Sequence, residues 1–74
     1  MEHVSQLLRA ARSQLGVSVG VLAKRNYCSR SSFYVYEQGK KIPTHMWTII
    51  DVANAYGIDP LELAAAVILD LQEQ

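Results

Sequence analysis

Apolar residues recur along most of the chain at intervals of three and four positions, the spacing of one face of an α-helix. In the first such segment, residues 4–16, arginine and serine separate the apolar positions, which are Val4, Leu7, Leu8, Ala11 and Leu15. No window alternates with a period of two for long enough to predict a strand. The pattern therefore predicts an all-α fold in which residues 1–74 form one compact domain.

Residues that start and stop helices divide the chain into five predicted helices. The predicted ends are glycines, which adopt the left-handed conformation of a helix end without steric cost: Gly16, Gly39 and Gly57. The predicted starts are capping residues or a proline at the first helical position: Ser18, Ser29, Pro43-Thr44 and Asp59-Pro60. Glu62, three residues after Asp59, strengthens the last start, so the fifth helix is expected over about residues 60–71.

The two C-terminal helices are richer in apolar residues than the others. For the fourth helix we expect an inward face of Met46, Ile49, Ile50, Ala53 and Tyr56, with Trp47 partly buried. The fifth helix is apolar nearly all round, more than one small core can absorb, and this predicts a homodimer. The predicted dimer residues are Leu63, Ala64, Val67, Ile68 and Leu71. The alternative is that these residues complete the core of a monomer.

The formal net charge of zero combines two segments of opposite sign. Residues 24–41 carry five lysines and arginines against Glu37, which gives +4. Residues 42–74 carry five carboxylates and no lysine or arginine, which gives −5. A molecule with one basic segment can dock a polyanion through that side in spite of its neutral total.

Two short predicted helices around a brief turn form a predicted helix-turn-helix over about residues 18–38. In this motif the N-terminal residues of the second helix enter the major groove of DNA, so that end must be polar and uncrowded. Here it consists of Ser29, Arg30, Ser31 and Ser32. Arginine suits bidentate contact with guanine, and serine can contact base edges or phosphates.

The stretch from Leu8 to Leu63 resembles the lambda-repressor-like, Cro/C1-type (XRE) helix-turn-helix family. The resemblance rests on LRAARSQLGVS, LAKR, SRSSFYVYEQGKKIP and TIIDVANAYGIDPLEL in this order and spacing. It covers three-quarters of the chain and implies a five-helix DNA-binding domain. The chain departs from the family at Val19, where glutamine is usual, and at Tyr27, where the turn has glycine.

The resemblance also implies roles for individual residues. The base-contacting positions correspond to Ser29, Arg30, Ser31 and Val35. The phosphate-contacting candidates are Ser18, Ser32, Tyr34, Gly39, Lys40 and Lys41. Arg12 and Glu37 correspond to a structural ion pair, and the core positions correspond to Ala23, Cys28, Phe33 and Tyr36.

These features predict a transcription regulator that binds double-stranded DNA, a repressor that reads an inverted repeat as a homodimer. The alternative is a protein-interaction module of the same fold that does not bind DNA by itself; a regulatory protein partner fits either reading. No catalytic set, cofactor or metal site is predicted, since His3 and His45 have no ligand cluster at metal spacing. The single Cys28 and the lack of a membrane-length apolar run or secretory signal favour the cytoplasm.

Overall fold

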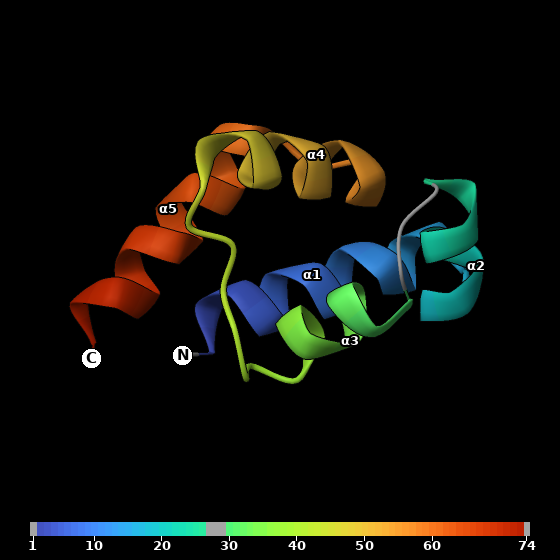
Figure 1. Cartoon of the computed structure of the whole chain (residues 1–74), viewed down its shortest axis with the longest axis horizontal. Helices are drawn as coiled ribbons and strands as arrows, with labels where there is room; N and C mark the ends of the chain where they lie inside the picture. Colours follow the sequence, from blue (N-terminus) through green and yellow to red (C-terminus); the bar gives the residue numbers. More distant parts are fainter. Residues whose placement is uncertain (1, 27–29, 74) are drawn as a thin grey trace.

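The computed structural model describes residues 2–26 and 30–73, with residues 30 and 31 described for their backbone only. Over these residues the fold is all-helical, as predicted. The helices are α1 (His3–Leu15), α2 (Val19–Arg25), α3 (Arg30–Glu37), α4 (Met46–Tyr56) and α5 (Pro60–Gln72). α1 contacts α3, α4 and α5 and so lies at the centre of the bundle (Figure 1).

Local capping chemistry accounts for most of the helix ends. Gly16 and Gly57 adopt left-handed conformations with φ of 70° and 71°, and their N–H groups bond to the last turns of α1 and α4. The Ser18 hydroxyl accepts from the N–H of Val21 at 3.2 Å, and the Asp59 carboxylate accepts from the N–H of Leu61 at 2.9 Å. These four predicted signals act as the sequence indicates.

The prediction for the start of α4 was wrong. Thr44 does not begin the helix, which starts at Met46 after His45 and has no side-chain cap. Pro43 is buried and Ile42 packs against the core, so the chain before α4 is held by apolar contacts. The inward face of α4 consists of Ile49, Val52, Ala53 and Tyr56. Met46, expected on the inward face, is 74% exposed, and Trp47, expected to be partly buried, is 70% exposed.

The core of the bundle draws apolar side chains from every helix. Its buried members are Val4, Leu8, Ala11, Val19, Leu22, Ala23, Phe33, Val52, Ala53, Tyr56, Leu63, Ala66 and Val67. Leu63 and Val67 were predicted at a dimer interface, and this part of the prediction was wrong, because the chain's own core covers them. Ala64, Ile68 and Leu71 remain wholly or partly on the surface.

Asp70 is a buried carboxylate that joins the two ends of the chain. Although it lies in the last turns of α5, its oxygens accept from the N–H groups of His3 and Val4 at 2.9 and 3.0 Å. The first turn of α1 has no side-chain cap of its own, so Asp70 provides one from another helix. The imidazole of His3 also contacts the carboxylate of Glu73 at 2.5 Å.

Candidate nucleic-acid interface

The helix-turn-helix consists of α2 and α3, which pack against each other at the right of Figure 1. Leu22 and Ala23 are 2% exposed, as is Phe33 on α3, so the two helices share one apolar contact with the core. A small residue at position 23 lets the two helices approach closely. Phe33 and Ala23 therefore occupy core positions as predicted.

A buried network fixes the orientation of α3. The Nε of Arg12 on α1 donates to both carboxylate oxygens of Glu37 at 3.0 Å, and Glu37 is only 4% exposed. This is the ion pair that the resemblance implied. Arg12 also donates to the carbonyl of Val17 at 3.2 Å. Through Arg12, the Glu37 side chain at the end of α3 is therefore connected to α1 and to Val17, which lies before α2.

Tyr56 is a third member of this network that the sequence analysis assigned only to the core. Its hydroxyl donates to Glu37 at 2.6 Å, and its ring packs edge-on against Phe33 with 5.3 Å between centroids. Burial, reinforced by the hydrogen bond to Glu37, raises the pKa of Tyr56 far above its usual value, so the phenol remains a donor. A buried tyrosine hydroxyl needs a hydrogen-bond partner. The position of Tyr56 on the predicted inward face was therefore the signal in the sequence that it bonds to a buried polar group.

The turn after α3 brings basic residues back alongside the helix. Gly39 has a φ of 74°, a conformation that favours glycine. The N–H of Lys40 then bonds to the carbonyl of Val35 at 3.2 Å, which ties the turn to α3. Lys40 and Lys41 are both exposed. Three of the phosphate-contact candidates, Gly39, Lys40 and Lys41, thus lie in one turn at the end of α3.

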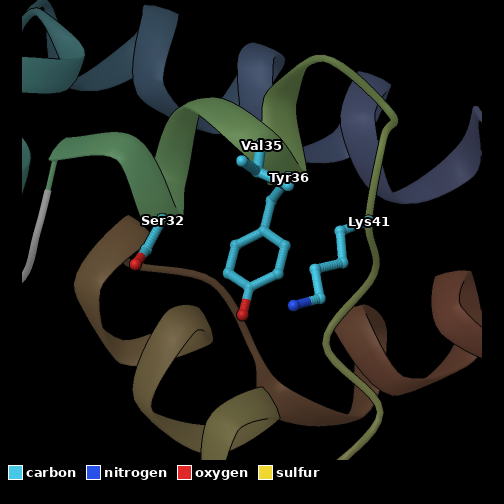
Figure 2. Close-up of a pocket in the computed structure, with 4 residues that line it drawn as sticks. All are labelled: Ser32, Val35, Tyr36 and Lys41. Carbon is cyan, nitrogen blue, oxygen red and sulfur yellow. The ribbon is translucent and has the colours of Figure 1, made fainter.

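A shallow surface pocket of about 180 Å³ lies beside α3 and is lined by Ser32, Val35, Tyr36 and Lys41. Figure 2 shows the ends of the Tyr36 and Lys41 side chains pointing toward one another across it. Three of these residues are predicted DNA contacts, whereas Tyr36 was expected in the core and is only half-buried. The pocket combines a cation, hydroxyl groups and an apolar wall, a set that suits a phosphate and its adjoining sugar.

The remaining candidates are only partly described by the structure. Arg30 is the first residue of α3, but its side chain and that of Ser31 lie outside the described residues. Ser29 lies outside them altogether, as do Cys28 and Tyr27. Tyr34 is exposed on α3.

The start of α2 differs from the family pattern in a way that the structure makes clear. Val19, which replaces the usual glutamine, is 5% exposed and belongs to the core. The exposed Ser18 immediately precedes it. The Ser18 oxygen accepts the capping bond, and its hydrogen is still available to a phosphate oxygen.

One group of metal-ligating side chains gathers in the part of the chain that the structure describes. It consists of His3, Asp70 and Glu73, whose ligand atoms lie within 4.8 Å of one another. His3 is separated in sequence from Asp70 and Glu73 by nearly the whole chain, so local spacing does not predict this group. The Asp70 carboxylate accepts from the N–H groups of His3 and Val4, and the His3 imidazole contacts Glu73, so these contacts hold α1 to α5.

The sequence profile of the helix-turn-helix domain matches residues 3–66. The chain belongs to this family. The match covers α1 to α4 and the first half of α5, and the family is of the Cro/C1 type that the residues resembled. Helix-turn-helix domains are DNA-binding units and are not typically enzymes.

No curated protein and no solved structure matches the chain. None of the described helices of this helix-turn-helix protein has the length and apolar character needed to cross a membrane.

Proposed function

We propose that this helix-turn-helix protein is a sequence-specific transcription regulator that represses by binding an inverted-repeat operator as a homodimer. The observation that carries the proposal is the geometry of α3. Glu37 attaches the end of α3 to α1 and α4, and the turn that holds Lys40 and Lys41 folds back beside it. A fixed helix with basic residues at its end is what insertion into a major groove requires.

In this proposal Ser29, Arg30, Ser31 and Val35 contact base edges, and the phosphates are held by the following set: Ser18, Ser32, Tyr34, Gly39, Lys40 and Lys41. Val35 is half-buried and apolar, so its contact would be with a thymine methyl group. Two copies would place their α3 helices in successive major grooves about 34 Å apart. The regulator would act in the cytoplasm, on the nucleoid, controlled by its own concentration or by a partner protein, without a cofactor or catalytic activity.

A second candidate function is a protein-interaction module that keeps the fold without binding DNA alone. Two observations favour it. Val19 leaves no long polar side chain at the start of α2 where the family has glutamine, and large apolar residues of α4 and α5 are exposed. The two functions differ in salt dependence, because only phosphate contacts release counterions as DNA binds.

The experiment that tests the proposal is selection from a pool of randomised duplexes at low and moderate salt, followed by sequencing of the retained DNA. Enrichment of an inverted repeat with half-sites about one helical turn apart is the expected result. If no sequence is enriched and no salt-sensitive binding is detected, the interaction module becomes the better reading.

Arg30 and Lys40 are expected to affect DNA binding in different ways. Arg30→Ala should relax the base preference at one position in each half-site, with a loss of about 1–3 kcal/mol on the preferred sequence. Lys40→Ala should weaken all sequences alike and lower the salt slope by about one per site. Both are measured by titrating selected and scrambled duplexes at several salt concentrations.

The matched control is Arg9→Ala, which removes an exposed positive charge from α1 at a position that is not among the predicted contacts. It should leave base preference unchanged and alter the affinity less than Lys40→Ala does. Equal effects of Arg30→Ala and Lys40→Ala on every sequence would contradict the assignment of base and phosphate contacts.

A further inference from the structure

An imidazole and two carboxylates meet where α1 begins and α5 ends. Asp70 in the last turn of α5 and Glu73 directly after that helix are three positions apart, a spacing that places two side chains on one side of a helix. His3, the first residue of α1, lies beside them. Figure 1 shows the start of α1 and the end of α5 close together, and the bond from the His3 N–H to Asp70 joins them.

The negative charge at this point has no lysine or arginine near it in sequence. The last turn of α5 contains no basic residue, and residues 42–74 contain no lysine or arginine. Glu73 follows the C-terminal end of a helix, where the helix dipole disfavours a carboxylate. Asp70 is a second carboxylate close to it, so two like charges are also held together. A cation between these side chains would offset both unfavourable effects.

Each of the three side chains has a lone pair left for a metal ion. The two oxygens of Asp70 each accept one backbone N–H, and a carboxylate oxygen has two lone pairs, so each keeps one. The side chains of His3 and Glu73 are 41% and 53% exposed, which gives an ion access from solvent. Asp70 would therefore be the fixed, buried ligand, and the other two would be the ligands that can move.

The donor set favours zinc among the common divalent ions. Imidazole nitrogen together with carboxylate oxygen suits Zn²⁺, whereas Mg²⁺ and Ca²⁺ prefer oxygen ligands alone. A dication bound to one neutral imidazole and two carboxylates gives a total charge of zero. Three protein ligands leave a fourth position of a tetrahedral ion open to water.

The observed spacing needs only a small adjustment to hold this ion. Zinc–ligand bonds of about 2.0–2.2 Å in a tetrahedron set the ligand atoms roughly 3.3 Å apart. In the structure Nε2 of His3 and Oε2 of Glu73 are 2.5 Å apart, and the ligand atoms of the three residues all lie within 4.8 Å of one another. Movements of about 1 Å by the two exposed side chains would close the site around the ion.

We propose that His3, Asp70 and Glu73 bind one Zn²⁺, which fastens the start of α1 to the end of α5. The direct contact between His3 and Glu73 is the form of the site without the ion. Because Arg12 of α1 holds Glu37 of α3, the ion would stabilise the helix that supports α3. The inference does not rest on the proposed function: none of the three ligands is a predicted DNA contact, and DNA binding does not require the ion.

Calorimetric titration of ZnCl₂ into the full chain tests the site. The chain carries Cys28→Ala, because a thiolate also binds zinc. We expect one ion per chain, and a rise in Tm of about 10 °C or more when free Zn²⁺ is at about a hundred times its Kd. The same concentration of MgCl₂ should not raise Tm, which separates the site from a general attraction of cations to carboxylates.

Two variants and a matched control identify the ligands. His3→Ala and Glu73→Gln should each weaken Zn²⁺ binding at least about tenfold, since each removes a ligand and a lost supporting group alone costs about that much. His45→Ala is the control, because the other histidine is exposed and makes no capping bond, and it should bind Zn²⁺ unchanged. All three changes are at exposed or half-exposed side chains, so the helical circular dichroism without zinc should remain that of the parent chain.

Three results would overturn the proposal: no heat and no rise in Tm with Zn²⁺, equal binding by His3→Ala and the parent chain, or half an ion per chain, which would place the ion between two copies. None of them bears on DNA binding. Selection of duplexes in the presence of a chelator tests that function separately. An inverted repeat retained there leaves the proposed function standing whether or not zinc binds, and zinc binding without any duplex binding would leave the site standing alone.

Discussion

Replacing Glu37 by alanine is expected to destabilise the fold by about 3 kcal/mol, which for a domain of this size lowers Tm by about 12–24 °C. The change leaves the guanidinium of Arg12 and the buried hydroxyl of Tyr56 without their shared acceptor. Removing one partner of a buried ion pair costs about 3–5 kcal/mol, and the lower end applies because the Arg12 side chain is 27% exposed and can be partly rehydrated. Urea unfolding measures the loss.

Two further variants separate the parts of this network. Tyr56→Phe removes only a hydrogen bond to a charged group and keeps the ring contact with Phe33, so its cost should be about 1.5–3 kcal/mol. The double variant Arg12→Met with Glu37→Met removes both charges together and should cost less than Glu37→Ala alone. A loss below about 1 kcal/mol for Glu37→Ala would show that the network does not hold α3 in place.

Asp70→Ala should cost about 2–4 kcal/mol, an effect that nothing in the local sequence around α1 suggests. It removes both acceptors of the His3 and Val4 N–H groups, and Val4 is fully buried, so water cannot easily replace them. It also removes a negative charge from the N-terminus of α1, where the helix dipole favours one. Amide hydrogen exchange at these two residues, together with urea unfolding, gives the measurement.

Asp59→Ala is the matched comparison, since Asp59 is also a capping carboxylate but is exposed and serves its own helix. Its loss should be about 1 kcal/mol. Asp70→Asn should fall between the two, because the amide oxygen accepts one bond and the amide NH₂ opposes the other N–H. An Asp70→Ala variant no less stable than Asp59→Ala would contradict the capping role.

The features that could be predicted from sequence are those decided by neighbouring residues. Gly16, Gly57, Ser18 and Asp59 end or cap helices through bonds to backbone groups within a few positions, so composition and order suffice. The Arg12–Glu37 pair joins distant segments and was accessible only through the family resemblance. Its third member, Tyr56, was not.

Periodicity failed where a helix is apolar on more than one side. In α4 the predicted stripe and the observed one share Ile49, Ala53 and Tyr56, and only packing against α1 and α5 selects Val52 over Met46. In α5 the same ambiguity placed Val67 at a dimer interface. Asp70 follows Leu63 by seven positions, on the face that turned out to be buried, so its position alone hinted at an inward carboxylate.

The separation of charge between the two parts of the chain affects how the protein meets DNA. The +4 segment, residues 24–41, comprises the end of α2, α3 and the following turn, whereas the −5 segment comprises α4, α5 and the connections beside them. Figure 1 shows the two on different sides of the molecule. The molecule is therefore an electric dipole. In the field of a phosphate backbone it experiences a torque before any contact is made, and it arrives with α3 foremost. Raising the salt concentration shortens the range of that torque, so encounters become less often productive and the association rate falls.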